Sequence, residues 1–158
     1  MKILVVAAHP DDEILGCGAT IAKLAGQGHE AYTLILGEGK SSRSTSGKVS
    51  LLAKEIKILK KESEGANSLI GVKRVFWSDL PDNRFDSIDL LDIVKKVEVV
   101  KERIRPDIIF THHAGDLNID HQITFRAVIT AARPLGGETV KDIYSFEIPS
   151  STEWNSYF

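Results

Sequence analysis

Continuous apolar runs alternate along the chain with longer stretches whose apolar residues recur every three or four positions. A continuous apolar run predicts a strand that is buried on both faces, and the longer spacing predicts a helix with one buried side. The predicted strands cover residues 2–7, 29–36, 71–77, 107–111 and 141–147, and the predicted helices cover residues 16–25, 51–69, 87–105 and 122–132. This order predicts a single α/β domain over residues 1–158, Rossmann-like and doubly wound, with a mostly parallel sheet and helices on both faces.

A polar cluster follows the first predicted strand, in the stretch Ala8-His9-Pro10-Asp11-Asp12-Glu13. In parallel sheets, ligands bind beyond the carboxyl ends of the strands, and this cluster lies at such an end. Burying an imidazole and two carboxylates there is costly unless something neutralises them, and a divalent metal would do so. The alternative is structural, because Asp11 or Asp12 could cap the helix that follows.

A second polar cluster supports the interpretation as a metal site. The stretch Asp116-Leu117-Asn118-Ile119-Asp120-His121 follows the apolar run 108–110. If the two strands are parallel neighbours, both clusters meet at one edge of the sheet. Catalytic zinc usually takes three protein ligands and a water, and the second cluster offers the third ligand.

Composition narrows the classes of function. Hydrophobic residues make up 42% of the 158 residues and charged residues 27%, as in an ordinary globular domain. The formal net charge of −2 provides no basic surface for nucleic acid. No apolar stretch approaches the roughly 20 residues that span a bilayer, so we expect no membrane span. The chain has one cysteine, Cys17, which cannot form an internal disulfide, and we expect a cytoplasmic protein.

Together the two clusters resemble the motifs of the PIG-L/LmbE-like family of zinc-dependent N-deacetylases, and the resemblance runs from residue 1 to about residue 153. It implies a Rossmann-like fold and a small-molecule substrate, an N-acetylated amino sugar of the N-acetylglucosamine type from which the acetyl group is removed. Carried over by motif position, His9, Asp12 and His121 would hold Zn²⁺ or another divalent metal. The resemblance also implies that Asp11 is the general base that activates the metal-bound water.

The motif departs from the family pattern at the position of the catalytic acid. Asn118 stands where the family often has the first His of a His-Pro-Asp-His motif. An amide can donate a hydrogen bond to an oxyanion, but it cannot act as an acid. We therefore expect His112 or His113 to take the acid role, with Asp120 orienting one of them, because histidine titrates near neutral pH. The alternatives are a subgroup with altered chemistry, and a His pair that packs on the sheet edge or binds the metal in place of His121.

Two further loops at the same edge are candidates for substrate binding. The first, residues 40–48, is rich in Ser, Gly, Lys and Arg and has no apolar periodicity. The second, residues 79–84, resembles a family segment that borders the site. The candidate substrate contacts are Arg43 in the first loop, Asp82 and Arg84 in the second, and Asn118 in the motif. The alternatives are a solvated first loop and a type I turn in the second.

Members of the family usually continue past the length of this chain with further strands and a helix, so the resemblance implies a C-terminally shortened domain. Relatives of this kind often form trimers or hexamers, so the resemblance also allows a homo-oligomer. Two other functions stay open at this point. One is a metallohydrolase of another amide, and the other is a sugar-binding or structural α/β domain without catalytic activity.

Overall fold

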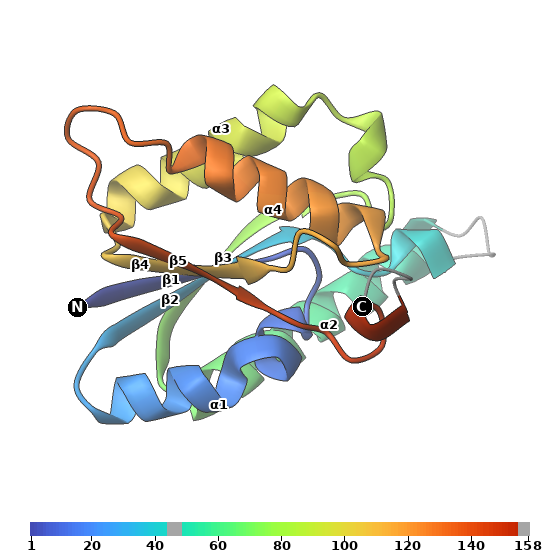
Figure 1. Cartoon of the computed structure of the whole chain (residues 1–158). Coiled ribbons are helices and arrows are strands. Elements are labelled where there is room, and N and C mark those ends of the chain that lie inside the picture. The colour runs from blue at the N-terminus through green and yellow to red at the C-terminus, as the bar shows by residue number, and fades with distance from the viewer. Residues whose placement is uncertain (44–48, 155–158) are drawn as a thin grey trace.

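The computed structural model describes residues 1–43 and 49–154, which form a five-stranded sheet covered by helices (Figure 1). The strands are β1 (Lys2–Ala7), β2 (Glu30–Gly37), β3 (Val72–Leu80), β4 (Ile108–His112) and β5 (Asp142–Phe146). The helices are α1 (Asp12–Gly26), α2 (Val49–Leu69), α3 (Leu90–Ile104) and α4 (Ile119–Ala131). Short 3-10 helices cover Ser41–Arg43, Phe85–Ser87 and Thr152–Trp154.

All strand pairs in this sheet are parallel, and the strand order is β3-β2-β1-β4-β5. The chain builds the sheet outward from β1 to β3 and then crosses back to place β4 on the other side of β1. This reversal is a topological switch point, where ligands bind in doubly wound folds. The Rossmann-like α/β fold predicted from the alternation of elements is confirmed.

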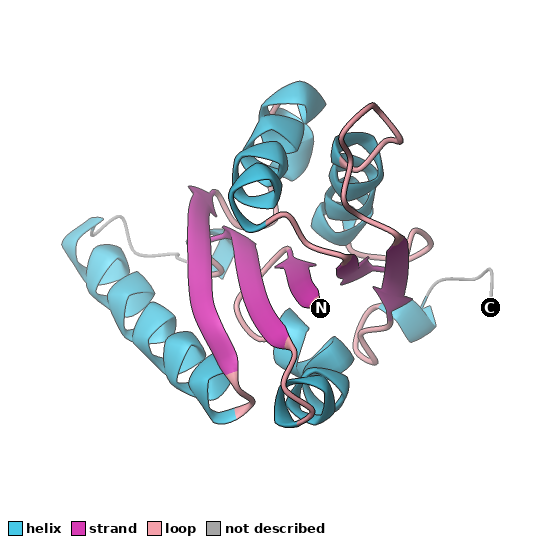
Figure 2. Cartoon of the chain, turned by 90° about the vertical axis from the view of Figure 1, so that its left-hand side faces the viewer, coloured by secondary structure: helices cyan, strands magenta, loops and turns pink. Residues whose placement is uncertain are grey.

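The helices cover both faces of the sheet (Figure 2). On one face, α3 and α4 pack on Leu4 and Val6 of β1. On the other face, Cys17 of α1 packs with Ile3 and Val5, and α2 lies on the same side against β3. Successive residues of a strand point to opposite faces, so the unbroken apolar run of β1 supplies both cores. Each buried aliphatic side chain contributes about 1.5–3 kcal/mol to folding.

Two helices begin three or four residues earlier than the apolar periodicity predicts. α1 starts at Asp12, directly after the loop that follows β1. α4 starts at Ile119, because the side chain of Asn118 accepts a hydrogen bond from the backbone N–H of Asp120 at 2.9 Å and caps the helix. The early starts place Asp12 and Glu13 of the first cluster, and Asp120 and His121 of the second, in the first turns of helices at the carboxyl edge of the sheet.

The helix predicted over residues 87–105 begins later in the structure, at Leu90. A 3-10 turn at residues 85–87 precedes α3, because the fully buried ring of Phe85 holds this connection against the core. Within residues 1–43 and 49–154, none of the helices combines the length and apolar character that a membrane span requires.

Candidate metal centre and catalytic cavity

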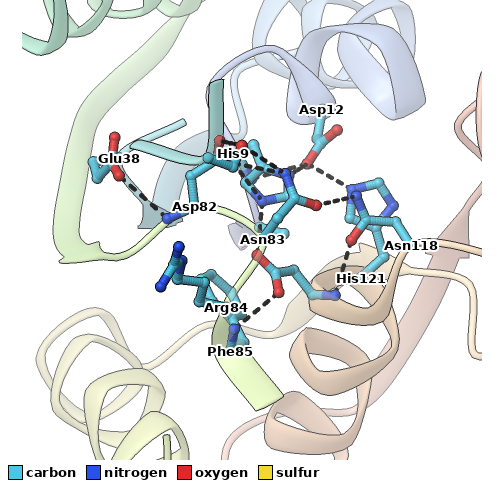
Figure 3. Close-up of polar contacts among 12 residues, drawn as sticks. His9, Asp12, Glu38, Asp82, Asn83, Arg84, Phe85, Asn118 and His121 are labelled. Atoms are coloured by element: carbon cyan, nitrogen blue, oxygen red, sulfur yellow. Dashed lines mark hydrogen bonds and ion pairs between the residues drawn. The ribbon is translucent and has the colours of Figure 1, made fainter. Parts of the chain in front are cut away.

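The two polar clusters meet at the carboxyl edge of the sheet. β1 and β4 are hydrogen-bonded neighbours, so the loops that follow them lie beside one another. The loop after β3 reaches the same place and brings Asp82 to His9 (Figure 3). A cavity of about 320 Å³ opens there. Its lining residues are His9, Pro10, Asp11, Asp12, Leu15, Gly39, Lys40, Leu59, Asp82, Asn83, Asn118, His121, Ile148, Ser150 and Ser151.

The predicted metal ligands His9, Asp12 and His121 lie together, with one ligand atom from each within 4.8 Å of the others. Asp12 Oδ2 is 3.5 Å from His9 Nδ1 and 3.3 Å from His121 Nε2. The same oxygen accepts the backbone N–H of His9 at 2.9 Å, which ties the loop after β1 to the start of α1. Two imidazoles and one carboxylate, open to a cavity, form a donor set that suits catalytic zinc.

Each of the two imidazoles has a further carboxylate on its other nitrogen. His9 Nε2 is 2.9 Å from Asp120 Oδ2 and 3.3 Å from Asp82 Oδ1. His121 Nδ1 is 3.2 Å from Asp116 Oδ1. A carboxylate in this place fixes the tautomer and orientation of a metal-binding imidazole and raises its basicity. The arrangement leaves Nδ1 of His9 and Nε2 of His121 for a metal.

The charges in this cluster also fit a cation. Burial lowers the pKa of His9, but the carboxylates of Asp12 and Asp120 raise it to about 10. Burial likewise lowers the pKa of His121, and Asp116 and Asp12 raise it to about 9. Burial raises the pKa of Asp12, yet the imidazoles around it hold that pKa well below its usual range. Buried carboxylates in such number need positive charge nearby, which either protons on the two imidazoles or a divalent metal supplies.

His112 is a packed imidazole beneath His121. It is fully buried, and the centroids of the two rings are 3.9 Å apart. Its Nε2 accepts the backbone N–H of Ala8 at 2.9 Å, which occupies the lone pair that a metal would need. Burial lowers the pKa of His112, and Nδ1 has no hydrogen-bond partner among the described residues. The structure therefore holds His112 neutral and away from the cavity.

The structure does not bring the other predicted acid to the cavity either. His113 is half-buried, and its Nδ1 accepts the backbone N–H of Gly115 at 3.1 Å. We expected Asp120 to orient His112 or His113, but its Oδ2 faces His9 and its Oδ1 accepts the backbone N–H of Phe85 at 3.0 Å. The reason is the early start of α4, whose first turn directs Asp120 to the loops after β1 and β3.

Asp11 occupies the N-cap position of α1, yet its side chain makes no capping hydrogen bond. The Asp12 carboxylate is engaged by His9 and His121. Helix capping therefore does not account for these two carboxylates. Asp11 is exposed and lines the cavity directly beside the predicted ligand Asp12, which is the place that a general base would occupy.

The structure places two of the four predicted substrate contacts, Asp82 and Asn118, at the cavity. Asp82 is buried in the cavity wall and accepts a hydrogen bond from Ser42 Oγ. Asn118 also lines the cavity, and its Nδ2 donates to Asn83 Oδ1 at 3.2 Å. Arg84 is exposed, and Figure 3 shows its side chain to one side of the histidine and aspartate cluster. Arg43 ends a 3-10 helix, but its side chain lies outside the described part of the structure.

Two elements of the site had no role assigned from the sequence. Asp116 is fully buried, and its Oδ2 accepts hydrogen bonds from Thr152 Oγ1 at 2.6 Å and Ser151 Oγ at 3.0 Å. Burial raises the pKa of Asp116, but His121 and Thr152 lower it to about 2. Lys40 lines the cavity from the loop after β2. The position of Asp116 and Lys40 after strands was a usable signal, whereas residues 151–152 carried none.

A parallel α/β sheet with a two-histidine, one-carboxylate cluster at its switch point defines a Rossmann-like protein with a candidate metal centre. The family model described as PIG-L, GlcNAc-PI de-N-acetylase, matches residues 4–132. The chain belongs to the PIG-L family.

The chain is similar to one curated protein and to two solved structures. The chain is 29% identical over 160 residues to the uncharacterized deacetylase YaiS of Escherichia coli K12, which covers 98% of this chain and 77% of that protein. It is 25% identical to the N,N'-diacetylchitobiose deacetylase of Pyrococcus horikoshii, solved with an inhibitor, with a TM-score of 0.73 over 87% of this chain and 52% of that chain. It is also 25% identical to GalB, the 4-carboxy-2-hydroxymuconate hydratase of Pseudomonas putida, with a TM-score of 0.74 over 91% of this chain and 64% of that chain. The chain thus spans about half to two thirds of the length of these two solved relatives.

Proposed function

We propose that this protein is a deacetylase that uses zinc or another divalent metal to hydrolyse the N-acetyl group of an amino sugar of the N-acetylglucosamine type. One observation carries the proposal: the cluster of His9, Asp12 and His121 opens onto a cavity whose wall carries the Asp11 carboxylate. Membership of the PIG-L family and the likeness to a diacetylchitobiose deacetylase support the substrate class. The cytoplasmic setting, the single domain and a homo-oligomer remain predictions from the sequence.

In this proposal the metal supplies Lewis acidity and lowers the pKa of the attacking water. The water adds to the acetyl carbon, the C–N bond breaks, and the products are acetate and a free amine. Asp11 takes the proton of the attacking water on its carboxylate, because it lies beside Asp12 and faces the cavity. The same proton then goes to the leaving nitrogen, so Asp11 serves first as base and then as acid.

The positions of the other polar residues support this double role. Neither His112 nor His113 lines the cavity, and the Nε2 of His112 is occupied by the backbone of Ala8. Asn118 Nδ2 has two N–H groups, of which Asn83 takes one, and the second can donate to the acetyl oxygen as negative charge develops there. The departure from the family motif at Asn118 thus retains a donor for the oxyanion and moves the acid role to Asp11.

A second candidate is a metal-dependent reaction on a small carboxylic acid. The likeness to GalB, a hydratase, favours it, since the same fold there accompanies a reaction other than deacetylation. Lys40 on the cavity wall would pair with a substrate carboxylate.

The test is acetate release by the zinc-loaded protein from N-acetylglucosamine, N,N'-diacetylchitobiose and an N-acetylglucosaminide. We expect release from at least one of the three, and a loss of release in Asp11→Asn. The matched control is Asp142→Asn, which changes an exposed carboxylate at the start of β5, at the amino ends of the strands and so away from the cavity. No acetate from any of the three, together with addition of water to an unsaturated dicarboxylic acid, would replace the first candidate by the second.

A further inference from the structure

Glu13 is a buried carboxylate that the proposed reaction does not use. It lies in the first turn of α1, directly after the predicted ligand Asp12, and it is 1% exposed. Its Oε1 accepts a hydrogen bond from Asn67 Nδ2 at 2.6 Å and another from Ser63 Oγ at 3.3 Å, both from α2. A carboxylate is costly to bury, and these hydrogen bonds offset part of that cost.

The other oxygen of Glu13 holds the backbone of the proposed base. Glu13 Oε2 accepts the backbone N–H of Asp11 at 3.1 Å. Asp11 has φ 114° and ψ −29°, in a region that residues with side chains rarely adopt. Its carbonyl oxygen accepts the N–H groups of Ile14 and Leu15 at 3.0 and 2.9 Å, the first bonds of α1. The Asp11 backbone is therefore held on both sides, by Glu13 at its nitrogen and by α1 at its oxygen.

Because the backbone at Asp11 is unusual, the carboxylates of Asp11 and Asp12 point in different directions. Asp12 is 4% exposed and faces the imidazoles, whereas Asp11 is exposed and lines the cavity. A strained conformation of this kind persists where the surrounding structure over-determines it, and such residues cluster at active sites. The hydrogen bond that the Asp11 N–H donates to Glu13 Oε2 fixes the backbone at this residue.

We propose that Glu13 is a positioning residue for the reaction: its carboxylate holds Asp11 in the strained conformation that places the base on the cavity wall while Asp12 faces the metal. The inference rests on the proposed function, because it takes the role of Asp11 as base from there. Glu13 itself touches neither the substrate nor the metal in this proposal.

The surroundings of Glu13 keep it in one place. Asn67 Oδ1 accepts a hydrogen bond from Thr33 Oγ1 at 2.8 Å, and Asn67 Nδ2 also donates to the carbonyl oxygen of Ser63 at 3.0 Å. With its oxygen engaged by Thr33, the amide of Asn67 presents its N–H groups to Glu13. The network joins β2, α2 and α1 and ends at the backbone of Asp11, and a fully satisfied buried network of this kind is rigid.

The first experiment measures kcat, KM and metal content in Glu13→Ala. We expect kcat to fall by about 10²-fold, because misplacing a catalytic group by about 1 Å costs that much. Metal stoichiometry and KM should stay near the parental values, because His9, Asp12 and His121 keep their contacts. The matched control is Cys17→Ala, which removes a buried side chain one turn further along α1, away from Asp11. The control should keep the parental kcat even if its melting temperature falls.

A second experiment exchanges the donor and acceptor side chains of the buried hydrogen bond between Asn67 and Glu13. Glu13→Gln keeps an acceptor for the Asp11 N–H but sets an amide NH₂ group against that of Asn67, and Asn67→Asp sets two carboxylates against each other. The double variant Glu13→Gln/Asn67→Asp restores donor to acceptor between residues 13 and 67, and the new carboxylate still accepts from Thr33, but the donor to the Ser63 carbonyl oxygen is lost. We expect both single variants to lose kcat and the double variant to have a higher kcat than either of them.

The outcomes separate this inference from the proposed function. A folded, metal-loaded Glu13→Ala with the parental kcat, or a loss of kcat that tracks loss of metal, overturns the positioning role. If Glu13→Ala does not fold, a double variant that folds, binds metal and has a kcat no higher than the single variants overturns it. If the parent protein releases no acetate, the proposed function fails, and a crystal structure of Glu13→Ala decides the remaining question. A negative φ at Asp11 in that structure supports the positioning role, and an unchanged φ refutes it.

Discussion

Replacing Asp120 by Asn tests the carboxylate that orients His9. The buried Asp120 Oδ2 lies 2.9 Å from His9 Nε2, and its Oδ1 accepts the Phe85 N–H at 3.0 Å. The amide that replaces the carboxylate has one acceptor oxygen for these two donors. Either the His9 N–H or the Phe85 N–H therefore loses its acceptor, and the orientation of His9 becomes less well fixed.

The size of the effect follows from what remains around His9. Losing a carboxylate behind a metal-binding imidazole typically costs about 10–100-fold in metal affinity. Asp82 Oδ1 stays 3.3 Å from the same nitrogen and is still an acceptor, so we expect the lower end, about tenfold or ~1.4 kcal/mol. The double variant Asp120→Asn/Asp82→Asn removes both carboxylates and should reach about 10²-fold. The unpaired donor should also lower the free energy of unfolding by about 1–3 kcal/mol.

The assay is a zinc titration in competition with a chromogenic chelator, with denaturant unfolding of the metal-free protein beside it. Asp142→Asn, at the amino ends of the strands, is the control and should leave the zinc affinity and the free energy of unfolding unchanged. An unchanged zinc affinity in Asp120→Asn would show that Asp120 acts on the fold alone. Complete loss of stoichiometric binding would instead make Asp120 a ligand, in the alternative group of His9, Asp82 and Asp120.

Three further predictions concern the same centre. Asp11→Asn should keep the metal and lose about 10²–10⁴-fold in kcat, because it removes a positioned base; loss of the metal in this variant would show that Asp11 is a ligand. His121→Ala should lose bound zinc in elemental analysis, whereas His29→Ala, at the opposite edge of the sheet, should keep it; retained zinc in His121→Ala would make another residue the third ligand. Zinc binding at pH 8 should release about two protons, measured by calorimetry in buffers of different ionisation enthalpy. The carboxylates raise the pKa of His9 to about 10 and the pKa of His121 to about 9, so both imidazoles are protonated at this pH and must lose a proton to bind metal. Binding without proton release would show that both imidazoles are already neutral in the metal-free protein.

Much of the fold was predictable because it depends on local patterns. The unbroken apolar run of β1 and the period of the helices are set by which residues a strand or a helix presents to the core. The two polar clusters were predictable for the same reason, since each follows a strand. That they meet depended on β1 and β4 being neighbours, which the sequence allowed and the sheet order established.

The contacts within the site were not predictable from the sequence. The sequence suggested Asp120 as the partner of His112 or His113, but the early start of α4 turns it to His9. His112 follows the same strand pattern as a cavity residue, yet it is buried beneath His121. These outcomes depend on where a helix begins and which way a ring faces, and both are decided by packing between distant segments.

Local sequence patterns establish the α/β alternation, the family and the residue types that could hold a metal. The folded arrangement was needed to show which nitrogen of each imidazole faces Asp12, that Asp116 supports His121, and that Glu13 reaches the backbone of Asp11. The physical reason is a difference in range. Periodicity acts between residues a few positions apart, whereas hydrogen bonds at about 3 Å require atoms from separate elements to be placed with sub-ångström accuracy by the whole packed core.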